Sequence, residues 1–162
     1  MKKTARVLLA ITALTLPMMV QAQVPVTAAS SQQALLISDN AQLKANKQLV
    51  YDFWREVFEG GHLEKADQYL SEDYIQHNPN VPTGRKGFVD FFKQYSQPKP
   101  VQDEISAPLV SIVAERDMVI LSFAKEYKEP NDAGKTYTTT WFDMFRIEDG
   151  KIAEHWDPAQ RW

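Results

Sequence analysis

The chain has 162 residues, of which 44% are hydrophobic and 24% are charged, and it contains no cysteine. We expect a single domain with one packed core, because this length suits one core and not two. Disulfides, thiol catalysis and thiolate metal sites are excluded, and the formal net charge of −3 disfavours nucleic acid as a partner.

The first 22 residues have the three parts of a secretory signal peptide. Lys2, Lys3 and Arg6 form a basic start, residues 7–20 are almost entirely apolar, and Ala22 closes a site of small residues. We predict cleavage after Ala22 and a periplasmic or secreted protein. An uncleaved anchor is the alternative, but the apolar run is shorter than the roughly 20 residues that span a bilayer. After cleavage, 15 Lys and Arg face 21 Asp and Glu, a charge of −6, so we expect neither nucleic acid nor membrane as a partner.

The next part of the chain is expected to be a flexible linker followed by helices. Residues 23–39 are rich in Ala, Ser, Gln, Val and Thr without a sustained period, which is typical of a linker. From residue 40 to the end of the chain we predict one folded domain. Apolar residues at helical spacing predict a long first helix that Asp39 or Asn40 caps and the Gly60-Gly61 pair ends. A short helix over 63–70 and a third helix after Gly84 follow the same rule.

The second half of the chain changes to the alternating pattern of strands. We predict four strands over residues 107–115, 118–129, 135–147 and 151–157. The turns between them are short, which indicates an antiparallel meander with the helices on one face. The other face is also apolar in places, with Phe142, Met144 and Trp156 on it, so we expect a second copy of the chain to cover it.

An acidic residue, Asp143, stands in the middle of a strand that is otherwise fit for burial. A buried carboxylate needs a partner or a raised pKa. A three-residue loop at 148–150 would pair Asp143 with His155, whereas a two-residue loop would set it opposite Trp156. We favour the three-residue loop, because Gly150 at its last position suits a positive φ. The pair could simply fix the strand register, or it could be a base with its orienting partner.

The remaining candidates each have a structural and a functional interpretation. His77, before Asn78-Pro79, could end a strand or point into a cavity mouth, and Trp54 and Tyr74 could be core aromatics or ligand contacts. Glu154 and Asp157 are interpreted as exposed or turn residues. The sequence lacks the short motifs of serine hydrolases, zinc peptidases and dinucleotide-binding enzymes. The histidine spacing matches no metal motif, so we expect no metal.

Three tracts of the chain have residue patterns that can be compared with known families: residues 74–79, the Gly84-x-x-Gly87-Phe88 start of the third helix, and residues 143–157. Together they resemble the SnoaL-like branch of the nuclear transport factor two-like superfamily, over about residues 46–157. The resemblance implies an α+β fold in which a curved antiparallel sheet wraps around three helices as a cone-shaped barrel with an internal pocket. It also implies a homodimer packed through the sheets.

The resemblance carries functional expectations as well. Polyketide cyclases of this family perform an intramolecular aldol reaction without a cofactor, using a pocket Asp as acid and base with a His nearby. Carried over, Asp143 is the catalytic residue, His155 its neighbour, and His77 and Asn78 line the pocket. We count three aromatic residues as further substrate contacts: Trp54, Tyr74 and Trp156.

The sequence thus predicts an exported acid/base enzyme of the aldol-condensation, cyclase or isomerase type that acts on a small apolar carbonyl compound. In this hypothesis Asp143 removes a proton next to the carbonyl, and His155 or His77 donates a hydrogen bond to the developing enolate oxygen. One alternative is a periplasmic binding protein for a hydrophobic small molecule. Another is an interaction domain with a filled pocket, which predicts no cavity near His155.

Overall fold

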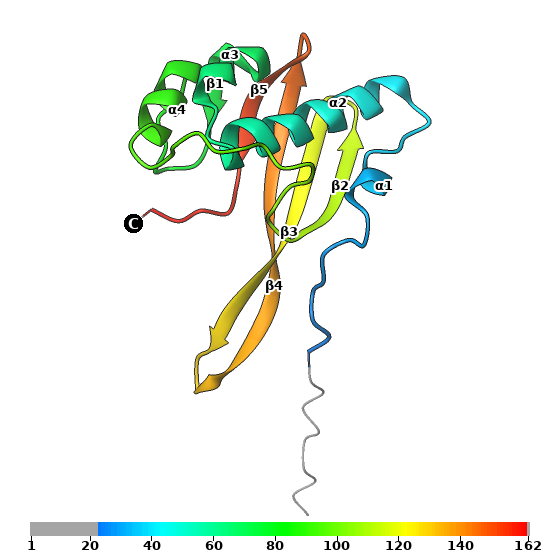
Figure 1. Cartoon of the computed structure of the whole chain (residues 1–162), viewed down its shortest axis with the longest axis vertical. Coiled ribbons are helices and arrows are strands. Elements are labelled where there is room, and N and C mark those ends of the chain that lie inside the picture. The colour runs from blue at the N-terminus through cyan, green and yellow to red at the C-terminus, as the bar shows by residue number, and fades with distance from the viewer. Residues whose placement is uncertain (1–22, 162) are drawn as a thin grey trace, which may run out of the picture.

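The computed structural model describes residues 23–161, and Figure 1 shows its helices and strands. The predicted signal peptide lies outside the described residues. The helices are α1 (Gln32–Leu35), α2 (Ala41–Asp52), the π-helix η1 (Phe53–Glu59), the 3₁₀-helix η2 (Leu63–Lys65), α3 (Ala66–Tyr69) and α4 (Arg85–Phe92). The strands are β1 (Leu70–Gln76), β2 (Leu109–Glu115), β3 (Met118–Glu129), β4 (Asp132–Glu148) and β5 (Lys151–Trp156). Over residues 23–161, no helix is both long and apolar enough to span a bilayer.

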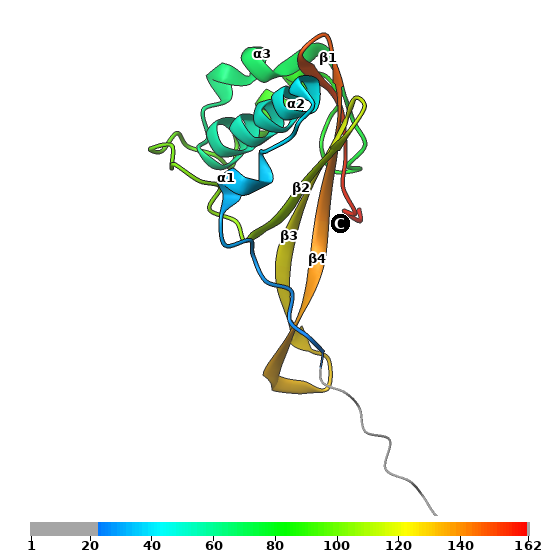
Figure 2. The same cartoon turned by 90° about the vertical axis from the view of Figure 1, so that its right-hand side faces the viewer.

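The five strands form one open, curved sheet in the order β1-β5-β4-β3-β2. The last four strands are an antiparallel meander, as predicted, and the helices gather on one face of the sheet (Figure 2). The α+β fold class is therefore confirmed. The sheet is mixed rather than wholly antiparallel, because β1 returns from the helices and pairs parallel with β5.

The predicted long first helix is present, but it changes type halfway. Asn40 caps it, its Oδ1 accepting hydrogen bonds from the backbone N–H groups of Gln42 and Leu43 at 2.9 and 3.1 Å. α2 then continues without a break into the wider π-helix η1, whose Trp54 is 8% exposed. Such π-turns are rare, and they often lie at functional sites.

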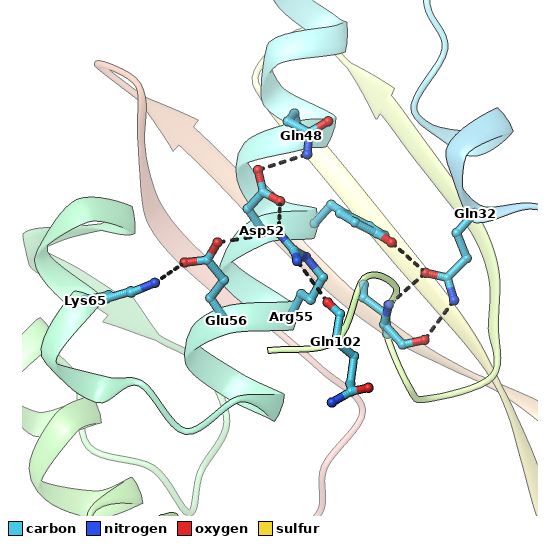
Figure 3. Close-up of polar contacts among 9 residues, drawn as sticks. Gln32, Gln48, Asp52, Arg55, Glu56, Lys65 and Gln102 are labelled. Atoms are coloured by element: carbon cyan, nitrogen blue, oxygen red, sulfur yellow. Dashed lines mark hydrogen bonds and ion pairs between the residues drawn. The ribbon is translucent and has the colours of Figure 1, made fainter. Parts of the chain in front are cut away.

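The segment that was expected to be a flexible linker carries helix α1 and contacts with distant parts of the chain. Gln32 of α1 is 8% exposed, and its side chain closes a small polar network in the core (Figure 3). Its Oε1 accepts hydrogen bonds from Tyr51 Oη at 2.9 Å and from Ile105 N at 3.0 Å. Its Nε2 donates to Ile105 O at 2.8 Å. This amide therefore joins α1 to α2 and to the loop before β2.

A row of charges ties the helices to that same loop (Figure 3). Lys65 pairs with Glu56 at 2.8 Å, and Arg55 pairs with Asp52 at 3.1 Å. Arg55 Nη1 also donates to the backbone oxygen of Gln102 at 2.9 Å. These contacts hold the loop between α4 and β2 against η1, where it forms part of a pocket wall.

The hairpin between β4 and β5 has a two-residue loop, so the predicted three-residue loop is wrong. Glu148 pairs with Lys151, and the two loop residues Asp149 and Gly150 have φ of 49° and 71°. An Asp-Gly pair with both φ positive is the preferred sequence for the tightest hairpin turn. The loop length therefore follows from the preference of Asp149 and Gly150 together for a two-residue turn, rather than from Gly150 alone.

A β-bulge in β5 follows two residues after this turn. Ile147 pairs with Ile152, but Arg146 pairs with Glu154, so Ala153 has no partner on β4. One extra residue on one strand reverses the faces of all the residues beyond it. The bulge therefore determines which side of the sheet the end of β5 presents to the helices.

The bulge turns His155 into the core. Without it, a two-residue hairpin would set His155 opposite Met144, on the face away from the helices. With it, His155 lies opposite Phe145, which is 1% exposed. Asp143 comes two residues before Phe145 on β4 and so shares that inner face.

Replacing Gly150 by Ala should lower the free energy of unfolding by about 1–2 kcal/mol, because a Cβ is strained at its φ of 71°. Apart from its chain neighbours, no heavy atom of residues 23–161 lies within 4 Å of the added Cβ, so the loss would come from the backbone alone. The Gly134→Ala variant near the turn between β3 and β4 is the control, with an expected change below about 0.5 kcal/mol. Urea unfolding checks both values, and equal losses in the two variants would contradict the turn assignment.

Candidate active site

A pocket of about 480 Å³ lies between the helices and the inner face of the sheet. Aromatic side chains form a large part of its wall: Phe53, Trp54, Phe58, Tyr74, Phe88, Phe91, Phe92, Phe123, Trp141 and Phe145. A few polar side chains interrupt this wall: Glu59, Gln76, Asn78, Lys125, Asp143, His155 and Asp157. An apolar pocket with a few converging polar groups is the usual form of a small-molecule site.

Asp143 and His155 meet in the wall of this pocket. His155 Nε2 lies 3.0 Å from Asp143 Oδ1, and the two residues are only 7% and 4% exposed. They are diagonal neighbours across β4 and β5 rather than the direct pair that the sequence predicted. The second oxygen of Asp143, Oδ2, is buried and has no hydrogen-bond partner within residues 23–161. A buried acceptor without a partner is costly, so this oxygen is available to a ligand.

Burial raises the pKa of the Asp143 carboxyl above its usual range, because desolvation disfavours the charged form. The hydrogen bond and charge of His155 work in the opposite direction. Nearby Asp157 raises the pKa further, and Lys125 lowers it. Desolvation is the largest of these effects, and a carboxylate with a raised pKa is a stronger base near neutral pH.

A chain of hydrogen bonds supports the other side of the histidine ring. His155 Nδ1 lies 2.8 Å from Oε1 of Gln76, its direct partner in the parallel pair of β1 and β5. Gln76 Nε2 donates to Tyr74 Oη at 3.0 Å. Tyr74 is 1% exposed, and its burial raises the pKa of the phenol, so it stays neutral. Gln76 was not predicted as a site residue, because no pattern in the sequence indicates that β1 pairs with β5.

Asp157 is a second carboxylate of the pocket and was also missed. It was interpreted as an exposed or turn residue, but it is half-buried and lines the cavity. Its Oδ2 accepts a hydrogen bond from Asn78 Nδ2 at 2.8 Å, and its Oδ1 accepts one from Ala159 N. The signal that could have found it is strand alternation, because Asp157 comes two residues after His155.

Three pocket groups lie close enough together to be considered as metal ligands. Donor atoms of Asp143, His155 and Asp157 all lie within 4.8 Å of one another. Two of these atoms, Asp143 Oδ1 and His155 Nε2, already share a hydrogen bond at 3.0 Å, which a metal ion would have to replace. The expectation that no metal takes part stays a prediction.

The structure separates the other predicted contacts into two groups. Trp54, Tyr74 and Asn78 line the pocket. Among the described residues, His77 and Trp156 are not part of the pocket wall. Trp156 follows the inward His155 in β5, and His77 follows the inward Gln76 just beyond the end of β1, so both point outward. Their rings stack with centroids 4.7 Å apart, and His77 Nε2 lies 3.1 Å from a carboxylate oxygen of Glu154. The interpretation of His77 at a cavity mouth and of Trp156 as a substrate contact is corrected accordingly.

Comparisons with known proteins bear on the family and the fold of the chain. The model of the SnoaL-like domain family matches residues 50–155. An NTF2-like protein from Anabaena variabilis is similar in structure, with 20% identity, a TM-score of 0.51 and coverage of 76% of this chain and 96% of that one. A LEH-like epoxide hydrolase from M. tuberculosis has 12% identity, a TM-score of 0.50 and coverage of 74% and 81%. No curated protein sequence matches. At these identities the two structures support the fold alone.

The Asp143→Asn variant should gain stability relative to the wild type as the pH rises from 4 to 8. Because the pKa of Asp143 is raised in the fold, its ionisation opposes folding, and this cost is absent below the unfolded pKa and complete above the folded one. Urea unfolding at several pH values measures the difference between the two proteins. The exposed Asp73→Asn variant controls for the loss of one charge. A difference that shrinks with rising pH would show that Asp143 is stabilised as an anion.

Proposed function

The chain belongs to the SnoaL-like domain family, and on this premise we propose that it is a cofactor-independent acid/base enzyme acting on a small, largely apolar carbonyl compound. One observation carries the proposal. In an aromatic pocket, the buried carboxyl of Asp143 has a raised pKa and one oxygen without a partner in the described chain. This is the arrangement that proton abstraction next to a carbonyl requires.

Asp143 would act through Oδ2, since its Oδ1 already faces His155. Oδ2 takes the proton from the carbon next to the carbonyl, the C–H bond breaks, and its electron pair forms the enolate. In an aldol or cyclase reaction the enolate carbon then attacks a second carbonyl carbon. In an isomerase the proton returns to a different carbon. Neither course needs an oxidant or a reductant.

The enolate oxygen needs a different donor from the one that the sequence suggested. Both ring nitrogens of His155 are engaged, and His77 lies on the outer face. Lys125 is the one Lys or Arg in the pocket wall of the described chain, and its Nζ lies 4.5 Å from the ring centroid of Trp141. We assign the stabilisation of the negative oxygen to Lys125.

A binding protein for a hydrophobic small molecule is the alternative, and the aromatic wall favours it as much as it favours an enzyme. Native mass spectrometry of protein purified from the periplasm would separate the two, because a binding protein should retain an unchanged ligand. The third reading, an interaction domain with a filled pocket, predicted no cavity near His155. The 480 Å³ pocket that His155 lines counts against it.

We further propose export and a homodimer. Export rests on the basic and apolar residues that precede Ala22. The dimer rests on the sheet face away from the helices, where four apolar residues form one row across four strands: Val113, Ile120, Met144 and Trp156. Val113 is 54% exposed, and Phe142 on the same face is 51% exposed. Such a surface is typical of a subunit interface.

The proton-abstraction step can be measured without knowing the natural substrate. We expect the wild type to accelerate deuterium exchange at the carbons next to the carbonyl of 2-tetralone in D₂O, followed by ¹H NMR. Asp143→Asn should lose at least about 100-fold in rate, because it removes the base. The rate should rise with pH through the raised pKa of Asp143, and EDTA should not change it. Wild-type exchange in a folded Asp143→Asn protein would refute the assignment.

The dimer can be tested separately. Phe142→Glu places a charge on the outer face and should convert a dimer into a monomer, as measured by light scattering after size-exclusion chromatography. Tyr95→Glu, at a residue that is 75% exposed after α4, is the control and should leave the mass unchanged. A wild-type monomer at micromolar concentration, or a Phe142→Glu dimer, would contradict the interface.

A further inference from the structure

We propose that Gln76 is a positioning residue that fixes the tautomer of His155, so that Asp143 and His155 hold a single shared proton between them. The inference deepens the proposed function, on which its catalytic meaning rests. The assignment of the His155 tautomer itself depends only on the hydrogen bonds.

The direction of the Gln76 amide is determined by the backbone. The N–H of Asn78 can only donate a hydrogen bond, and the side-chain atom of Gln76 that lies 2.9 Å from it must therefore be the oxygen. The opposite end of the amide then donates to Tyr74 Oη at 3.0 Å. A flipped amide would set two donors against each other at Asn78.

This direction fixes where the ring proton of His155 lies. Gln76 Oε1 is 2.8 Å from His155 Nδ1, and an amide oxygen only accepts. Nδ1 must therefore carry a hydrogen. In a neutral imidazole the other nitrogen, Nε2, is then bare.

The bare nitrogen faces Asp143 Oδ1 at 3.0 Å, so that contact needs a proton of its own. The proton comes either from an imidazolium beside a carboxylate or from a carboxylic acid beside a neutral imidazole. In both cases the pair holds one shared proton and has no net charge. The more familiar arrangement, a neutral histidine donating from Nε2 to a carboxylate, would leave Nδ1 and Gln76 Oε1 as two facing acceptors.

The shared proton gives the proposed reaction a relay. When Asp143 Oδ2 takes the substrate proton, the proton on the Oδ1 side ends on His155 Nε2. The carboxyl group is then neutral and His155 is an imidazolium, whose positive charge balances the enolate. The other charged groups that act on Asp143 are Asp157 and Lys125. Gln76 contacts neither reacting atom and acts through His155.

Nitrogen NMR of the imidazole rings tests the tautomer directly. The chain has only three histidines, and the His155 signals can be identified by their loss in His155→Asn. We expect long-range ¹H–¹⁵N spectra of the wild type to show Nδ1 of His155 protonated. Gln76→Leu removes the acceptor, and the Nε2–H tautomer should then appear. Gln76→Glu keeps an acceptor oxygen and should keep Nδ1–H. Tyr74→Phe removes only the far contact of the amide and should also keep it.

The exchange assay with 2-tetralone adds the functional readout. Gln76→Leu should lower kcat by about 10-fold or more with little change in KM, and Gln76→Glu should restore most of it. A wild-type spectrum with the proton on Nε2 alone, or an unchanged tautomer in Gln76→Leu, would overturn the inference. If the spectra are as expected but no protein exchanges protons, the proposed enzyme function fails and the tautomer assignment stands. Should Gln76→Leu not fold, the wild-type spectrum still decides.

Discussion

One carboxyl group, held out of water in the wall of a largely aromatic pocket, is the constraint on which the site depends. Asp143 is 4% exposed, and within the described chain only one of its oxygens has a hydrogen-bond partner. A group in this position opposes folding when it ionises, and Asp is almost never fully buried in proteins unless it is paired. Burying Asp143 lowers the free energy of unfolding when the group is ionised, but the same desolvation makes its carboxylate a stronger base. Instability and proposed reactivity are two results of one burial.

The hairpin between β4 and β5 supplies the partner that this carboxyl needs. The tight turn at Asp149 and Gly150 would by itself direct His155 outward, and the extra residue Ala153 directs it inward. Gln76, from the parallel strand β1, then holds the second ring nitrogen. The hairpin of β4 and β5 and the strand β1, which is distant in sequence, thus position one imidazole. The bulge is a small local irregularity on which the composition of the pocket depends.

The sequence predicted the fold well and the site only in part. Helical and alternating periods located the long helix and the four-strand meander, because both record which face is buried. The contact of Asp143 with His155 was predicted from the wrong register: the turn is one residue shorter, and the bulge compensates for it. Gln76 was missed because its role depends on the parallel pairing of β1 with β5, which no local pattern records, and the direction of His77 depends on the same pairing. Asp157 could have been found from strand alternation, which also places Trp156 on the outer face.

The protonation of Asp143 itself tests the central claim most directly. Its side-chain carboxyl carbon can be followed by ¹³C NMR of the folded, uniformly labelled protein across a pH titration, and Asp143→Asn identifies the signal. The account predicts that this carbon titrates clearly above the ordinary aspartate value of 3.8, because burial outweighs the hydrogen bond to His155. A carboxyl that titrates at or below 3.8 would show an anion stabilised by the protein, and the proposed base would then have no source of reactivity.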